Sequence, residues 1–317
     1  MRAERPSAHA DELAMTQLIL LPCLDSDELA AARQAELRIS RRKAAQLGAS
    51  AVAAVHAGYY VASAGLRVPL REAVQAARAA KQSIAPDAVL PAQARVPFPE
   101  TRIQVSNETT LAASLRFVQH GLRPLALNFA NGIEAGGGFL DGALAQEEVL
   151  CRSSALHATL AGDPMYDAHH DRPTDDSTDW AILSPDVPVF RADDGTALPE
   201  PWLLSVLTCA APYAPTVGAQ LAGDLLQRRI HRVLEIAQAY GYESLVLGAW
   251  GCGAFENDPH RTATDFRHAL DTDFRGAFSD IVFAITDWSP QRKFLGPFRD
   301  AFVAEPPKAT RRPRGKL

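Results

Sequence analysis

The amino-acid sequence predicts an α/β protein in which helices cover both faces of a parallel or mixed sheet. Several short runs are apolar throughout, which is typical of strands buried on both faces, and segments with a helical period separate them. The clearest unit is a strand over Arg102–Ser106, a helix over Thr110–His120 and a buried strand over Pro124–Phe129. Strand, helix and strand in this order form the repeating unit of α/β folds.

The segments before this unit predict helices. Residues 1–30 lack a clean period and contain polar and proline breaks, so we expect a loose N-terminal arm. Helical periodicity covers Glu36–Tyr60, and an alanine-rich helix is expected over Leu70–Lys81. Prolines then mark an extended connection, because proline lacks the backbone donor that helices and strands use. We therefore expect residues 31–95 to form a helical extension packed on the core.

The core is expected to span residues 96–305 and to continue the α/β pattern. Helices are predicted over Gln146–Leu160 and Ala222–Tyr240, the second long enough to cover one face of the sheet. The remaining buried strands are predicted over Ala181–Ser184, Ser205–Ala210, Ser244–Ala249 and Asp280–Thr286. Residues 306–317 combine proline with basic side chains and predict a disordered tail.

Composition narrows the classes of function. The chain of 317 residues is 47% hydrophobic, which is sufficient for a sizeable core. Its net charge of −5 supplies no global positive field, so no stable nucleic-acid partner is expected and any nucleotide contact must be a local site. No stretch approaches the roughly 20 apolar residues that cross a bilayer, so no membrane association is expected. A monomer is expected.

The cysteines indicate a reducing compartment. All four are scattered, and none has the spacing of a zinc ligand, so we expect free thiols in a cytoplasmic protein. Asp11 and Glu12 precede the short apolar run Leu18–Leu21, where a signal peptide needs positive charge, so export is not expected. No motif requires a metal or a cofactor, and neither is expected.

The first segment with chemical potential is NFANGIEAGGGFLDGALAQEE, which covers Asn128–Glu148. It follows a buried strand and enters a helix, and strand, glycine loop and helix is the order that cradles anions. Glycines at Gly136, Gly137 and Gly138 allow positive φ and let a sugar or phosphate approach the main chain closely. The segment matches neither the P-loop nor the dinucleotide fingerprint.

Acidic residues open the helix that follows this loop. Gln146, Glu147 and Glu148 lie in its first turn, where the helix dipole alone favours carboxylates. The preceding glycine loop favours a chemical role, because it places a general acid beside a sugar-sized cleft. A carboxylic acid that works near neutral pH needs a raised pKa, and burial beside a second carboxylate acts in that direction.

The second segment is LVLGAWGCGAFENDP, which covers Leu245–Pro259 and again runs from a strand into a glycine turn. In open α/β sheets ligands bind at the carboxyl ends of strands. Backbone amides between Gly251 and Phe255 are suited to hold a diphosphate without any lysine. Glycine-rich turns also serve tight packing, so this loop alone does not identify a binding site.

The two segments together resemble the bacterial, macrodomain-like poly(ADP-ribose) glycohydrolases. The pattern of GGG, seven residues and QEE is similar to that family's signature, and GAWGCGAFENDP is similar to its phosphate loop. The resemblance extends to VSNETT at 105–110, SPDVPVF at 184–190 and TCAAP at 208–212, and it covers about residues 40–300. It implies a macrodomain-like three-layer α/β/α sandwich with a mixed sheet and exo-acting hydrolysis of ribose–ribose bonds in poly(ADP-ribose).

The resemblance also implies roles for individual residues. Glu148 would protonate the departing ribose oxygen and then activate water, while Glu147 would position the scissile ribose. ADP-ribosylated protein is the other substrate that the family suggests. The implied binding residues are Asn131 at the distal ribose, Gly136, Gly137 and Gly138 along the diphosphate and ribose, Gly251, Cys252, Gly253, Ala254 and Phe255 on the other side of the diphosphate, and Glu108 near the adenine. Gln146 is also implied to bind the substrate.

The sequence departs from the family pattern in two places. Ala135 stands where proline usually precedes GGG, which should loosen the loop. Glu256 stands where glycine is expected, and an acid pointing inward would repel a diphosphate. Structural roles are expected for other polar residues. Cys252 is expected to be a packed thiol, and His169 and His170 are expected to be exposed to solvent.

Two alternative functions fit the same residues. A non-catalytic reader would bind terminal ADP-ribose in the same cleft, but it would not need the two glutamates. Hydrolysis of a single ADP-ribosyl linkage would use the same acid, and fold-level analogy does not distinguish it from polymer hydrolysis.

Overall fold

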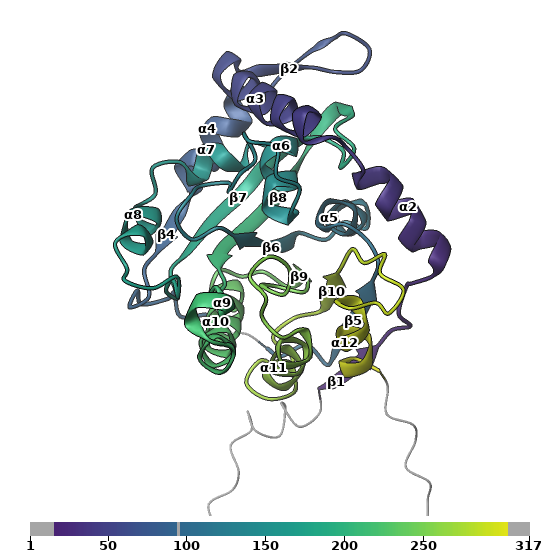
Figure 1. Ribbon diagram of the computed structural model, residues 1–317, viewed down its shortest axis with the longest axis vertical. Coiled ribbons are helices and arrows are strands. Elements are labelled where there is room, and N and C mark those ends of the chain that lie inside the picture. Colours follow the sequence, from purple (N-terminus) through teal and green to yellow (C-terminus); the bar gives the residue numbers. More distant parts are fainter. Residues whose placement is uncertain (1–15, 94–95, 304–317) are drawn as a thin grey trace, which may run out of the picture.

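The computed structural model describes residues 16–93 and 96–303 and contains an eight-stranded sheet in the order β1-β5-β10-β9-β6-β8-β7-β4 (Figure 1). The strands are β1 (Gln17–Leu20), β4 (Gln82–Ile84), β5 (Glu100–Ser106), β6 (Pro124–Ala130), β7 (Ala181–Arg191), β8 (Ala197–Ala210), β9 (Ser244–Leu247) and β10 (Asp280–Ala284). A separate hairpin pairs β2 (Tyr59–Val61) with β3 (Arg67–Pro69).

The sheet is mixed, as the family resemblance implied. Strands β1, β5, β10, β9, β6 and β8 pair in parallel, whereas β7 is antiparallel to β8 and β4 is antiparallel to β7. The parallel strands β6 and β9 are buried along their full length apart from Phe129, which explains their continuous apolar sequences. Because these strands run the same way, their carboxyl ends meet at one edge of the sheet.

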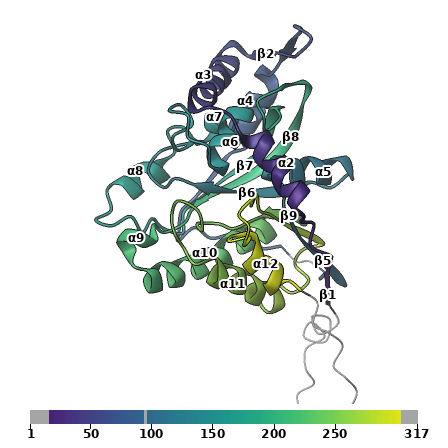
Figure 2. The ribbon, with the colours of Figure 1, turned by 45° about the vertical axis from the view of Figure 1, so that its right-hand side comes forward.

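Helices form a layer on each face of the sheet, which gives the three-layer sandwich (Figures 1 and 2). One layer holds α10 (Ala219–Ala239), α11 (Pro259–Asp271) and α12 (Leu295–Ala301). The other holds α3 (Arg41–Ala57), α4 (Arg71–Ala80), α5 (Thr110–Gln119), α6 (Gln146–Ser153) and α7 (Leu156–Leu160). The remaining helices are α2 (Asp27–Leu37), α8 (Pro164–His170) and α9 (Ala214–Val217).

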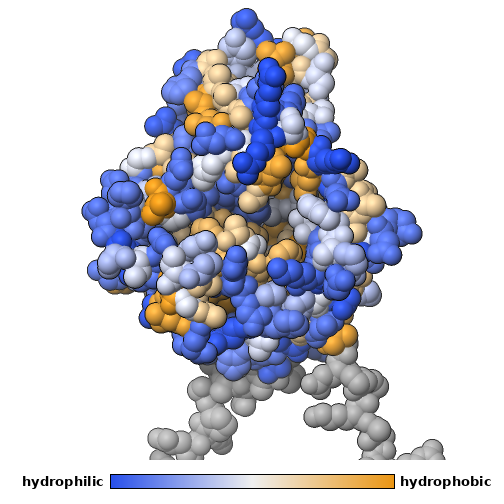
Figure 3. All heavy atoms as spheres, in the orientation of Figure 1, coloured by the Kyte–Doolittle hydropathy of each residue, from blue (hydrophilic) through white to orange (hydrophobic). Residues whose placement is uncertain are grey.

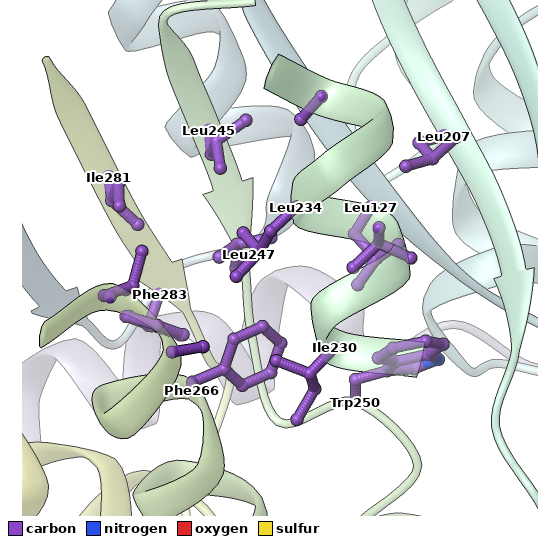
Figure 4. Close-up of a cluster of buried hydrophobic side chains, with 14 of the residues drawn as sticks. Leu127, Leu207, Ile230, Leu234, Leu245, Leu247, Trp250, Phe266, Ile281 and Phe283 are labelled. Carbon is purple, nitrogen blue, oxygen red and sulfur yellow. The ribbon is translucent and has the colours of Figure 1, made fainter. Parts of the chain in front are cut away.

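The core beneath α10 and α11 shows how the sheet and one layer interlock. Ile230 and Leu234 of α10 face Leu245 and Leu247 of β9, and Phe266 of α11 packs beside them (Figure 4). All five side chains are almost completely buried. Burial of each side chain contributes about 1.5–3 kcal/mol to the free energy of folding, so this layer holds the carboxyl ends of the strands firmly in place.

The structure corrects the expected N-terminal arm. Residues 17–20 form β1, the edge strand that pairs in parallel with β5, and Asp27–Leu37 form α2, whose first turn is capped by Ser26. A four-residue edge strand is too short to show a period, which is why the sequence did not reveal it. Residues 1–15, and the predicted tail at 306–317, lie outside the described residues.

Two further expectations change. The predicted helix over 146–160 is two helices, because Ser154 adopts an extended backbone and pairs with Val189 of β7. Within the expected helical extension, β4 joins the main sheet instead of a helix layer. None of the helices in the described part of the chain has the length and apolarity needed to cross a membrane.

Candidate active site

A cleft of about 870 Å³ opens at the edge where the parallel strands end. Its walls include residues directly after β5, β6, β8, β9 and β10, among them Glu108, Asn131, Ala211, Ala249 and Ile285. In the space-filling view, a hollow near the centre of one face exposes apolar side chains within a largely hydrophilic surface (Figure 3). The position is the one at which open α/β sheets bind ligands, and the volume suits a dinucleotide-sized molecule.

Glu147 is fixed at the back of this cleft. Its side chain is 3% exposed, Oε1 accepts a hydrogen bond from Asn128 Nδ2 at 3.1 Å, and Oε2 accepts one from the Asn131 amide at 2.7 Å. Burial raises the pKa of Glu147 to about 8, against the opposing effect of these hydrogen bonds. The carboxyl with the raised pKa is thus the one to which the family resemblance assigned a positioning role.

The buried carboxyl of Glu147 makes stability depend on pH. Between the ordinary glutamate value of about 4.3 and the folded value of about 8, the folded state binds more protons than the unfolded state. The free energy of unfolding is therefore expected to fall as pH rises through this range, by at most about 1.4 kcal/mol per pH unit. Urea unfolding at several pH values measures this slope, and Glu147→Gln should flatten it. An identical slope in wild type and Glu147→Gln would contradict the assignment.

Glu148 has one oxygen held and one free. Oε1 accepts a hydrogen bond from the Gly138 amide at 3.1 Å. Among the described residues, no group pairs with Oε2, although the side chain is only 8% exposed and lines the cleft. A buried polar oxygen without a protein partner is costly and is typical of a group that meets a ligand or takes part in chemistry. The two neighbouring carboxyls therefore differ in their contacts: Glu147 has both oxygens engaged, and Glu148 has one without a partner among the described residues.

The glycine loop packs directly against both carboxyls. Gly136 and Gly137 have φ values of 81° and 55°, which glycine adopts without strain. A Cβ atom on Gly137 would lie 2.6 Å from Glu148 Oε1 and 3.1 Å from Glu147 Oε2. The main chain thus holds the carboxyls at a distance that leaves no room for a side chain. None of the three predicted glycines lines the cleft itself. In this structure the loop therefore lies next to the cleft and supports the two carboxyls from there.

Asn131 and Gln146 both line the cleft but are partly occupied by structural contacts. Asn131 Oδ1 accepts hydrogen bonds from the amides of Ile133 and Glu134, which closes a tight turn after β6. The Gln146 side chain accepts from the Phe129 amide and donates to the Leu127 carbonyl, so it fastens the start of α6 to β6. This fastening places the next two residues, the glutamates, at the carboxyl end of the strand.

The second glycine loop forms the opposite wall. Of the residues predicted around the diphosphate, Gly251, Gly253, Ala254 and Phe255 line the cleft, but Cys252 does not. Its thiol is buried against Trp250 and Thr262, and burial raises its pKa to about 12, so it is a packed thiol.

Asn257 holds this loop in shape. Its Nδ2 donates to the carbonyls of Pro212 and Gly251 at 2.9 and 3.1 Å. No pattern in the sequence indicated this role. Glu256, the departure from the family pattern, is exposed and does not line the cleft. Its φ of 55° lies in the left-handed region, which explains why glycine suits the position.

Glu108, the predicted adenine-side residue, lines the cleft and forms an ion pair with Arg116 at 2.5 Å. Several other residues that line the cleft were not predicted. Asp193 comes from the turn after β7, and Trp288 and Phe294 come from the connection between β10 and α12, while Gln34, Leu37, Arg38 and Ile39 come from α2 and the turn after it. No local pattern marks them, because only the chain path brings these segments together. Among the described residues, no group of His, Cys, Asp and Glu side chains forms a metal-binding cluster.

The histidine pair was interpreted wrongly for one member. His170 is exposed, but His169 is 4% exposed and has hydrogen bonds at both ring nitrogens. A polar, aspartate-rich sequence favoured solvent exposure, whereas the tertiary fold turns this ring inward toward Gly132.

The fold and the cleft define a macrodomain-like α/β protein whose cleft, at the carboxyl ends of the parallel strands, is lined by two adjacent buried glutamates. A sequence profile described as "Microbial-type PARG, catalytic domain" matches residues 48–192. The poly(ADP-ribose) glycohydrolase structure from Thermomonospora curvata is similar to this chain, with a TM-score of 0.77 and 38% identity over 82% of this chain and 99% of that chain. The chain belongs to the microbial-type poly(ADP-ribose) glycohydrolase family.

Solved structures with bound ligands are also similar to this chain. The Thermomonospora curvata glycohydrolase bound to the inhibitor ADP-HPD matches with a TM-score of 0.76 and 38% identity, over 82% of this chain and 99% of that chain. The glycohydrolase from Deinococcus radiodurans in complex with ADP-ribose matches with a TM-score of 0.66 and 36% identity, over 74% of this chain and 98% of that chain. A search of curated proteins gave no match.

Proposed function

We propose that this protein hydrolyses poly(ADP-ribose) in an exo manner, releasing ADP-ribose, with Glu148 as the acid and base. The observation that carries the proposal is the buried Glu148 Oε2, which lines the cleft and has no partner among the described residues. Family membership and the similarity to ADP-ribose and ADP-HPD complexes support the substrate class.

The chemistry needs one group that gives a proton and later takes one. Glu148 donates its proton to the oxygen of the departing ribose as the bond to the anomeric carbon breaks, leaving an oxocarbenium-like centre. The Glu148 carboxylate then removes a proton from water as the water oxygen attacks that carbon, which restores the acid. Glu147, whose carboxyl is held at both oxygens, positions the ribose through its fixed place beside Asn131.

Binding of the diphosphate is assigned to the loop from Gly251 to Phe255. Phe255 is half-buried, lines the cleft and meets the Tyr213 ring edge-on with centroids 5.6 Å apart. Phe255→Ala is expected to weaken ADP-ribose binding about tenfold by removing contact area from the ligand. Calorimetric titration with ADP-ribose measures the effect. Unchanged affinity would remove Phe255 from the binding site.

The direct test uses purified poly(ADP-ribose) of defined chain length. An exo enzyme releases ADP-ribose monomers from the first minutes, whereas internal cleavage first produces shorter oligomers. Parallel assays on a singly ADP-ribosylated protein separate polymer hydrolysis from single-linkage hydrolysis. ADP-ribose binding without any product from either substrate would favour the reader function instead.

The cellular setting is part of the same proposal. We infer that the protein is cytoplasmic, supported by the free thiols of Cys151, Cys209 and Cys252, which are buried and unpaired with one another. We also propose that it is a monomer. Light scattering during gel filtration tests the oligomeric state, and a fluorescent fusion tests the location.

A further inference from the structure

His169, outside the cleft, contacts the loop that carries Asn131. It lies near the end of α8, and its Nδ1 is 3.0 Å from the carbonyl oxygen of Gly132. Its Nε2 is 2.7 Å from Thr178 Oγ1 and 3.1 Å from the Thr178 amide nitrogen. One buried ring thus joins three segments: α8, the turn after β6 and the residues before β7.

The partners define which ring nitrogen carries the proton. The Thr178 amide can only donate, so Nε2 must accept and cannot itself be protonated. The Thr178 hydroxyl accepts from the Trp180 amide and has its own hydrogen left to donate to Nε2. Nδ1 therefore carries the proton and donates it to the Gly132 carbonyl, which can only accept. The site specifies a neutral imidazole in a single tautomer.

The surroundings keep the ring neutral. Burial lowers the pKa of His169 to about 4, and the nearby charges of Arg229 and Arg172 act in the same direction. The hydrogen bond to Gly132 and the charge of Asp176 oppose this shift without reversing it. A neutral ring can therefore hold both partners across the physiological pH range.

Gly132 is clamped from several sides. A Cβ atom at this position would lie 2.4 Å from Ser177 Oγ and 3.3 Å from both Ala210 Cβ and His169 Nδ1. The turn therefore sits tightly between the end of β8 and the segment that follows α8. The preceding residue, Asn131, lines the cleft and donates its amide to Glu147 Oε2 at 2.7 Å. Movement of the Gly132 carbonyl would shift this amide, because the two groups are one residue apart.

We propose that His169 is a positioning residue: its Nδ1–H holds the Gly132 carbonyl and thereby fixes the Asn131 amide on Glu147. This inference rests on the proposed function for its kinetic consequence, but its structural part is independent. His169 acts through Gly132 and Asn131, and it neither lines the cleft nor bonds to either carboxyl. Loss of a positioning contact is costly because misplacement of about 1 Å reduces turnover on the order of 10²-fold.

Paired substitutions separate positioning from general stability. His169→Asn keeps an amide donor close to the place of Nδ1, whereas His169→Leu removes it, and both lose the Thr178 contacts. We expect His169→Leu to lower kcat by about 10–100-fold and His169→Asn to stay within about threefold of wild type. His170→Asn, at the exposed neighbour, is the control and should leave kcat unchanged. Equal losses in the Asn and Leu variants at equal melting temperature would overturn the proposal.

Two readouts do not depend on activity. Nitrogen NMR at pH 7 should show His169 as the Nδ1–H tautomer, and an Nε2–H tautomer would overturn the proposal. Hydrogen exchange of the peptide covering residues 129–139 should accelerate in His169→Leu and not in His169→Asn. If His169→Leu does not fold, His169→Gln replaces it, because its amide lies near the place of Nε2 and withdraws the donor from Gly132. Failure of wild-type hydrolysis would count against the proposed function and leave these readouts intact.

Discussion

Glu148→Gln is expected to abolish the release of ADP-ribose while the protein stays folded and still binds ADP-ribose. Glutamine has nearly the same shape and its carbonyl oxygen can accept the hydrogen bond that the Gly138 amide gives to Glu148. It cannot donate a proton to the ribose oxygen or take one from water, so both half-reactions lose their catalyst. We expect a loss of about 10²–10⁴-fold or more in kcat, measured as monomer release from purified polymer.

Glu134→Gln is the matched control for this substitution. Glu134 lies in the same loop region but is exposed and does not line the cleft. Glu134→Gln removes the same charge as Glu148→Gln but does so outside the cleft, so its activity should match that of wild type. Turnover by Glu148→Gln equal to that of Glu134→Gln would remove Glu148 from the mechanism. Loss of ADP-ribose binding together with turnover would instead show that the substitution damages the cleft.

Gly137→Ala should impair both stability and turnover. The new Cβ would lie 2.6 Å from Glu148 Oε1, and the alanine would have to adopt a backbone φ of 55°. The left-handed backbone costs an alanine about 1–2 kcal/mol, and the contact forces one or both carboxyls to move. Displacement of a catalytic group by about 1 Å is expected to lower kcat on the order of 10²-fold. Thermal unfolding and polymer hydrolysis measure the two effects.

Gly162→Ala separates the contact from the backbone strain. Gly162 has a φ of 75°, and a Cβ there would meet nothing within 4 Å. This variant therefore takes the same conformational cost without touching a carboxyl. We expect a lower melting temperature with the kcat of wild type. Comparable kcat losses in the two alanine variants would show that general destabilisation, and not the carboxyl contact, explains Gly137→Ala.

The strands and long helices could be predicted because their signals are local. Buried parallel strands such as β6 and β9 are apolar on both faces, and α10 has helical periodicity over most of its length. The break between α6 and α7 could not be predicted, because Ser154 leaves the helix to pair with Val189, a contact between residues far apart in sequence. Edge strand β1 was not predicted for a related reason: it pairs with β5, which is distant in sequence, and its own four residues have no informative period.

The candidate site divides in the same way. The sequence by itself determined that one glycine loop precedes Glu147 and Glu148 and that a second follows β9. Each loop is a continuous stretch of chain, so its glycines and the strand before it can be recognised locally. Only the tertiary structure decided that both oxygens of Glu147 are engaged and that one oxygen of Glu148 is free, since the engaging groups come from β6 and the turn after it. It likewise turned His169 inward and brought Asp193 and α2 to the cleft. Residue type and order are local properties, whereas burial and hydrogen-bond partnership depend on segments that meet only when the chain folds.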